Sequence, residues 1–506
     1  MRQHDVTRWI AALILLALPL TGCTGTEEIE DTEVAAEAAT VHELPLTTES
    51  DEAREHFLAG LAASDRGRFV EAREHFAAAN ASDPALAVGH LGQALNANST
   101  EEFASHLEAA AEAAADGASE AERLWIEIYQ KAFANDQEGR LASAEALAAA
   151  APESPRARLE VAQALAAVDR VADARSAAEE AVAGNPGFVA GHVFLVNNYM
   201  FGEPRDFAKA EEHAVVLTEV APDHAQSHDL LGDVHRAQGE LEAARADYTR
   251  ASELDDENGL ALQQRGHVNS FLGDWEQARA DYDAAIEEAD ANASAGYRVW
   301  RSLVSAYEGK PSDAVADLGE TADAIDSMGV DDPHGVKIFA LSEQALIAMH
   351  HGMPEEAEAA LDRIGTLMEE QAAAVGRDEF RRNQQAFLAY LRGRLAVQQG
   401  DLDAALARAD EIEQLVAGMA NPLADQPAHA LRGYVALAED DAEAAVEHLE
   451  ESSLANPYNR YQLARAQEAA GDAEAADRLY REVADYNFNN ADYSIVRQDA
   501  VDRASG

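Results

Sequence analysis

The chain has 506 residues and a formal net charge of −56, with 94 acidic side chains against 38 basic ones. So large a negative charge argues against nucleic acid and anionic lipid head groups as partners of the folded surface as a whole. Aromatic residues make up only 6% of the chain and no region shows alternating β-branched runs, which favours an all-helical class.

Residues 1–22 have the plan of a secretion signal. A basic start precedes an apolar run over residues 9–20, which is too short to cross a bilayer, where about 20 residues are needed. The run ends in Leu20-Thr21-Gly22-Cys23, which resembles the lipoprotein box of bacteria. This resemblance implies cleavage before Cys23 and lipid attachment to it. The alternative is an ordinary signal peptide with an incidental cysteine.

Cys23 is the only cysteine of the chain, so no internal disulfide can form. Several acyl chains, as the resemblance implies, would hold the protein on a membrane far better than a single chain does. Position 24 is threonine and not the aspartate that retains some lipoproteins at the inner membrane. We therefore expect a lipid-anchored protein of the cell envelope, attached to the outer membrane and facing the periplasm.

Residues 23–50 are predicted to form an acidic, disordered tether. The stretch after Cys23 carries eight acidic side chains, no lysine or arginine and no aromatic residue. Such a segment cannot bury enough apolar surface to fold. A flexible chain of this length would hold the following domain on the order of 30 Å from the bilayer.

Helical hairpins are predicted from residue 51 onward. Gly60, Ala72 and Phe76 give the first hairpin, over 53–86. Serine followed three residues later by glutamate, at 99 and 102 and again at 119 and 122, has the spacing of a capping box and predicts two helix starts. The hairpin frame stays open over 121–154, and again over 293–333.

The clearest pattern is a unit written twice between residues 225 and 292. Ala-Arg-Ala-Asp-Tyr stands at 244–248 and again at 278–282, a spacing of 34 residues, and Gly232 is answered by Gly266. Each unit predicts two helices, roughly 228–238 and 242–254 in the first copy, with Gly232, Ala244 and Ala251 where the helices must approach closely. This pattern resembles the tetratricopeptide repeat (TPR), a helix-turn-helix of the same length.

A single hairpin cannot bury its apolar face, so neighbours must stack on it. The resemblance implies an all-α fold, an α-solenoid in which TPR-type hairpins form a right-handed superhelix. We expect two halves, at 51–318 and 334–490, joined by a connection at 319–333 and followed by a capping helix and tail at 491–506. The second half should contain longer helices, at 338–351, 354–374, 380–399 and 402–417.

The first helices of such a superhelix line a concave groove, where a peptide or a helix of a partner usually binds. In the best-framed repeats, the groove-facing candidates are polar and of mixed charge: Gln163, Asn197, Gln226, Asp229, Asp233, Arg236, Gln263 and His267. The other interpretation of these side chains is that they simply face water, as exposed polar residues do.

Patterns of catalytic or metal chemistry are missing from the sequence. It contains no phosphate-binding glycine loop with its lysine, no Gly-x-Ser-x-Gly and no His-Glu-x-x-His. The adjacent His350 and His351 would point to different faces of a helix. We therefore expect no enzyme, no cofactor and no metal site.

These observations predict a lipid-anchored, non-catalytic TPR scaffold of the bacterial cell envelope that binds an unidentified protein or peptide in its groove, and no nucleic acid. The alternative is a periplasmic carrier or sensor that binds a small molecule between the two halves. The acidic surface agrees either with saline surroundings or with a basic partner, although its spread over every repeat favours the first.

Overall fold

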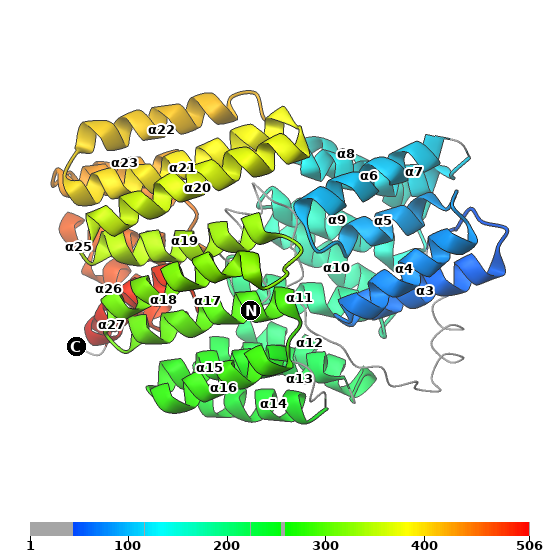
Figure 1. The fold of residues 1–506 in the computed structure, drawn as a ribbon, viewed down its shortest axis with the longest axis horizontal. Helices are drawn as coiled ribbons and strands as arrows, with labels where there is room; N and C mark the ends of the chain where they lie inside the picture. Colours follow the sequence, from blue (N-terminus) through cyan, green and yellow to red (C-terminus); the bar gives the residue numbers. More distant parts are fainter. Residues whose placement is uncertain (1–43, 116, 223, 255–258, 505–506) are drawn as a thin grey trace.

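A computed structural model describes residues 44–115, 117–222, 224–254 and 259–504. The predicted signal, Cys23 and most of the tether lie outside these residues. In the described ranges every regular element is a helix, and twelve hairpins followed by the single helix α27 stack side by side into one solenoid (Figure 1). The predicted all-α solenoid is confirmed.

The first helices of the hairpins lie towards the inside of the stack and contact one another. They are α3 (Asp51–Asp65), α5 (Ala87–Leu95), α7 (Glu120–Phe133), α9 (Pro155–Ala167), α11 (Val189–Phe201), α13 (Ala225–Ala237), α15 (Gly259–Leu272), α17 (Ala291–Tyr307), α19 (Pro333–His350), α21 (Asp378–Gln399), α23 (Gln426–Ala438) and α25 (Pro457–Ala470).

Each second helix packs against the first helix before it and the first helix after it. The second helices are α4 (Phe69–Ser82), α6 (Thr100–Ala115), α8 (Gln137–Ala150), α10 (Val171–Gly184), α12 (Phe207–Val220), α14 (Leu241–Leu254), α16 (Trp275–Glu288), α18 (Pro311–Ala324), α20 (Pro354–Val375), α22 (Leu402–Val416), α24 (Ala442–Glu450) and α26 (Ala473–Ala484). The last helix, α27 (Ala491–Ala504), has no second helix of its own.

Glycine followed by aspartate makes several of the turns inside the hairpins. Gly400 has a φ of +76°, which favours glycine, and the side chain of Asp401 then accepts a hydrogen bond from the backbone N–H of Ala404 at the start of α22. The capping box predicted at Ser119 and Glu122 is present at the start of α7. Local sequence thus fixes where these helices begin.

Small residues lie where the two helices of a hairpin meet, as predicted. A methyl group added to Gly232 would come within 2.7 Å of Cε1 of Tyr248, and one added to Gly60 within 2.8 Å of Cε1 of Phe76. The four helices predicted in the second half are confirmed as α19 to α22, the first of which begins five residues earlier than expected. The hairpins α7–α8 and α17–α18 settle the two frames that the sequence left open.

Two predicted boundaries need correction. The expected connection at 319–333 is largely helical, because α18 continues to Ala324 through the buried Leu318 and Ala322, and a 3-10 turn, Ile325–Ser327, follows. The core runs on without interruption across this segment, from Ala162 to Ala500. The smaller core cluster covers residues 44–164 and includes two residues of the long helices α20 and α21.

The tether is shorter than predicted at its C-terminal end. Leu44 is buried, and the Thr47 backbone N–H donates to Oε1 of Glu122 at 2.8 Å. The Thr48 hydroxyl donates to Asp83 at 2.6 Å. An apolar anchor and two threonines therefore attach residues 44–50 to the first hairpins, although the segment carries no aromatic residue.

Successive turns of the solenoid also contact each other. The Asn421 amide donates to Oδ1 of Asn135 at 2.8 Å, and the Gln137 backbone N–H donates to the carbonyl oxygen of Ala420 at 3.0 Å. Helices α6 and α20 pack directly together. The described chain is consequently closed upon itself, and its inner face is not open along its whole length.

Candidate functional site

The candidate groove lies on the inner helices α9, α11, α13 and α15, which contact one another in sequence order. These helices carry all eight predicted groove residues. Asp229, Asp233, Arg236, Gln263 and His267 are buried, while Gln163, Asn197 and Gln226 are partly buried. The alternative that these side chains simply face water is therefore wrong for the five buried residues. Their binding role stays a prediction.

For Arg236 and His267, the burial has an identifiable cause in the chain itself. After α26, residues 486–490, here called the C-terminal segment, run without helical structure, and every residue from 486 to 493 is buried. The segment lies against the inner side of α11, α13 and α15, more than 200 residues away in sequence. The groove thus contains an extended piece of polypeptide.

Phe488 is the apolar anchor of the C-terminal segment. Its ring meets that of Phe201 edge to face, with a centroid distance of 4.7 Å, and the guanidinium carbon of Arg236 lies 4.6 Å from its centroid. A cation held over a ring away from water contributes up to about 2 kcal/mol. Arg236, one of the predicted groove residues, therefore contacts the C-terminal segment of its own chain.

Arg236 is completely buried, and its charge is balanced within α13. Its Nη2 donates to Oδ1 of Asp233 at 2.6 Å, and its Nη1 donates to Oε1 of Gln264 at 3.0 Å. Asp233 also accepts from the Tyr248 hydroxyl at 2.8 Å. These contacts fix the guanidinium in place, since a buried ion pair is stable only when its polar atoms have partners.

His267 and Tyr282 form the second contact with the segment. The Asn489 amide donates to Nδ1 of His267 at 2.8 Å and to the hydroxyl oxygen of Tyr282 at 3.2 Å. Burial holds the pKa of His267 well below its ordinary value, so the ring is neutral and can accept a hydrogen bond. Gln263, another predicted residue, contacts Nε2 of the same ring at 2.8 Å.

The start of α27 continues the contact along the inner face. The Ala491 backbone N–H donates to Oε2 of Glu343 at 2.7 Å, and Asp492 pairs with Nη2 of Arg394 at 2.8 Å. Burial, opposed by the Ala491 hydrogen bond, raises the pKa of Glu343 to about 8. Glu343 is therefore mostly protonated at neutral pH.

The three partly buried candidates have other neighbours. Gln226 lies against the turn at Gly67 between α3 and α4, and borders a small hollow together with Arg66, Val193 and Leu230. The Asn197 amide donates to the carbonyl oxygen of Val193 on its own helix at 2.9 Å. Gln163 lies on α9, and the structure does not bring it together with the C-terminal segment.

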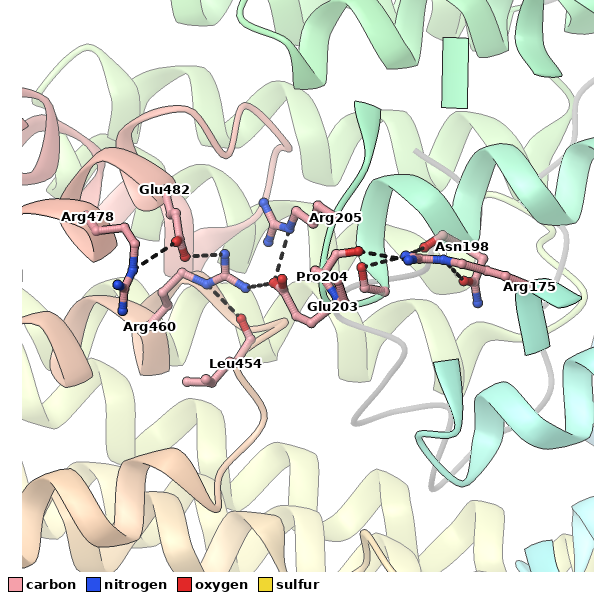
Figure 2. A network of polar contacts seen from close by, with 10 residues as sticks. Arg175, Asn198, Glu203, Pro204, Arg205, Leu454, Arg460, Arg478 and Glu482 are labelled. Atoms are coloured by element: carbon pink, nitrogen blue, oxygen red, sulfur yellow. Dashed lines mark hydrogen bonds and ion pairs between the residues drawn. The ribbon is translucent and has the colours of Figure 1, made fainter. Parts of the chain in front are cut away.

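A second polar contact joins the groove region to the last hairpin, and Figure 2 shows it. Arg460 of α25 pairs with Glu203, in the turn after α11, at 2.5 Å and with Glu482 of α26 at 3.0 Å, while its Nε donates to the carbonyl oxygen of Leu454 at 3.0 Å. On the other side of that turn, Arg175 donates to the carbonyl oxygen of Pro204 at 2.9 Å. We call this network the clasp.

Sequence reasoning missed both the C-terminal segment and the clasp. A signal for the segment existed, because Tyr486-Asn487-Phe488-Asn489-Asn490 is uncharged and contains two aromatic residues in a chain that is otherwise acidic. No comparable signal marked Glu203 or Arg460, since charged residues are common throughout the chain.

Two further features of the described residues concern metal ions and membranes. Across the described ranges, no three His, Cys, Asp or Glu side chains are grouped so that they could hold a metal ion. Within the same residues, no helix is both long and apolar enough to cross a bilayer.

Comparisons with known proteins find a repeat family and several solved structures that resemble the chain. A tetratricopeptide repeat model matches residues 225–258. Similar solved structures include a tetratricopeptide repeat protein from Parabacteroides merdae, with 19% identity over 57% of this chain and 98% of that one and a TM-score of 0.34. PilW, a type IV pilus biogenesis factor, is 18% identical over 50% of this chain and 97% of that one, with a TM-score of 0.29. The human IFIT1 dimer with PPP-AAAA is 14% identical over 90% of this chain and 94% of that one, with a TM-score of 0.37. A comparison with curated proteins finds no match. The matched repeat is the hairpin α13–α14, which carries four of the predicted groove residues.

Proposed function

We propose that this protein is a lipid-tethered, non-catalytic scaffold of the bacterial cell envelope that docks a protein partner through the groove of its first helices. The observation that carries the proposal is that this groove holds an extended stretch of polypeptide, the C-terminal segment of the chain itself, which Arg236 and His267 contact. Stacked helical hairpins commonly bind proteins on their concave side. The lipid tether is supported by the sequence around Cys23 alone.

The carrier or sensor alternative would need an enclosed pocket beside residues 319–333. In the described structure, Asp331 instead accepts hydrogen bonds from the amides of Asn98 at 2.7 Å and Asn292 at 2.8 Å. The hollow beside Gln226 lies elsewhere, near the turn between α3 and α4. These observations favour the scaffold over the carrier.

Two measurements test the proposal. Cys23→Ser should move the protein from the membrane fraction to the soluble fraction and abolish incorporation of labelled palmitate. A photo-crosslinking residue at Gln163, Asn197 or Gln226 should capture one protein from envelope fractions, at low and at high salt. The same residue at Glu180, exposed on the second helix α10, is the matched control.

The outcomes separate the two parts of the proposal. Equal capture at Glu180 and at the groove positions, or no capture at any of them, would exclude groove docking. A Cys23→Ser protein that stays on membranes would exclude the lipid anchor, and the docking result would be unaffected by it.

A further inference from the structure

We infer that the candidate groove, at α11, α13 and α15 and at the neighbouring α17, selects an extended, uncharged segment in which an aromatic residue is followed by carboxamide side chains. The chain's own C-terminal segment occupies this site, and a partner protein with a segment of the same chemistry enters when residues 486–504 leave. This inference rests on the proposed function and names its partner class and its regulation.

The position of Phe488 is selected by two side chains, one aromatic and one cationic. Phe201 offers the edge-to-face contact, and Arg236 offers its cation to the face of the Phe488 ring. A second aromatic residue of the segment, Tyr486, lies 5.5 Å from Phe488 between ring centroids. An aliphatic residue at this position would keep the apolar contact and lose the cation contact.

The carboxamide position is selected by hydrogen bonding. Asn489 is buried between the neutral ring of His267 and the hydroxyl of Tyr282, both within hydrogen-bond distance of its amide. One residue later, the Tyr307 hydroxyl donates to the backbone carbonyl oxygen of Asn490 at 3.4 Å. A carboxylate in place of Asn489 would bury a charge beside the neutral ring of His267 and would lose the N–H that this ring accepts, so an acidic segment is rejected.

Two features indicate that the segment can be exchanged. Residues 486–489 have no regular secondary structure, so side chains and isolated backbone contacts hold them and no hydrogen-bond ladder does. On both sides of the contact a buried polar atom has no hydrogen-bond partner within the described structure, namely Nε of Arg236 and Oδ1 of Asn489. Each such atom carries a desolvation cost, so a partner that satisfies them would compete well.

The pairing of the two helices within each hairpin does not involve α27. Each of the twelve hairpins is complete without α27, which contacts α17, α19, α25 and α26 along one side. Its polar attachments are side-chain contacts: Asp492 pairs with Arg394 and accepts from Asn456, Asp499 accepts from Tyr461, Arg503 pairs with Glu468, and Nη2 of Arg497 donates to the carbonyl oxygen of Phe271 at 3.1 Å. The C-terminal segment and α27 can therefore leave together while the hairpins stay folded.

The test uses the full chain with Phe488→Ala and Asn489→Ala, which removes the side chains that fill the groove and leaves its walls intact. The probe is a fluorescent synthetic peptide of residues 484–493, and the readout is fluorescence anisotropy. We expect the double variant to bind the peptide at least about tenfold more tightly than the unchanged chain, whose groove is occupied. Peptides with Phe488→Ala or Asn489→Asp should bind at least about tenfold more weakly.

A double variant that keeps its helical circular dichroism yet fails to bind the peptide overturns the inference. Equal binding of the Asn489→Asp peptide overturns it too. If the double variant does not fold, hydrogen exchange on the unchanged chain decides. The amides of 486–503 should then exchange together, at least about tenfold faster than those of α13 and α15. Exchange of all these amides at a single common rate overturns the inference.

The two proposals can fail separately. Failure of peptide binding together with crosslinking of an envelope protein from the groove positions would leave the scaffold in place and remove the selected chemistry. Peptide binding without any envelope partner would retain the groove chemistry and remove the scaffold.

Discussion

Replacing Gly232 by alanine tests how tightly the two helices of a hairpin are packed. The added methyl group would lie 2.7 Å from Cε1 of Tyr248, whereas favourable carbon contacts are about 3.5–4.0 Å. Tyr248 cannot easily retreat, because its ring is completely buried and its hydroxyl is bonded to Asp233. Overpacking of this kind costs about 1–3 kcal/mol. Alanine recovers about 1 kcal/mol of helix propensity, so we expect a net loss of up to about 2 kcal/mol.

The measurement should be local, because a long repeat array does not unfold in one cooperative step. Hydrogen exchange in α13 and α14 should accelerate by about tenfold for each 1.4 kcal/mol that the variant loses. Gly184→Ala at the end of α10 is the matched control, since no atom lies within 4 Å of its added methyl group. If both variants keep their local exchange rates, the close helix contact at Gly232 is not what limits packing.

Three further predictions concern charge. Arg460→Lys should destabilise the last hairpin by about 1–3 kcal/mol, because a single ammonium cannot replace the three contacts of the buried guanidinium. The partly exposed Arg245 is the control, and Arg245→Lys should change the local stability of α14 by no more than about 0.5 kcal/mol. Hydrogen exchange in α25 and in α14 measures the two effects. Burial raises the pKa of Glu343 to about 8, so its carboxyl costs stability as the pH rises above the unfolded value of 4.5. Hydrogen exchange in α19 should therefore show Glu343→Gln to be more stable than the unchanged chain at pH 8, on the order of a few kcal/mol, and the difference should vanish below pH 4.5. Burial lowers the pKa values of His192 and His213, whose Nδ1 atoms are 3.1 Å apart, so their contribution to stability is complete above pH 6.5 and falls as the pH decreases. His213→Gln should reduce the loss of local stability of α11 and α12 between pH 7 and pH 5, and an unchanged loss would contradict this.

The hairpins could be predicted from sequence because they depend on local information. A 34-residue period, glycines at close contacts and aspartates at helix starts are all visible within one or two repeats. The capping box at Ser119 and the contact of Gly232 with Tyr248 are of this kind, and the structure confirms both. The expected connection at 319–333 is largely helical, because the repeat pattern of the sequence is weak there although the helix α18 continues.

The sequence predicts that the eight candidate residues lie on the first helices of their hairpins, but it does not predict that five of them are buried. Burial of Arg236 and His267 depends on residues 488 and 489 returning to the inner face after twelve hairpins. The position of that return is set by a small rotation at each repeat, summed over the whole array. No short stretch of sequence records such a sum, so the local pattern left the groove open.

The distribution of positive charge connects the closed shape to the acidic composition. The chain has 34 arginines and four lysines, and the four lysines pair with nearby carboxylates on the surface. Several contacts between distant hairpins use arginine, as in Arg460 with Glu203, Arg394 with Asp492 and Arg497 with a backbone carbonyl, and none within the described residues uses lysine. A planar guanidinium with five donors can join several acceptors from different helices, which one ammonium cannot do. In a chain with a net charge of −56, arginine therefore supplies charged contacts between distant hairpins, beside amide contacts such as that of Asn421 with Asn135, and the excess of carboxylates is left to water.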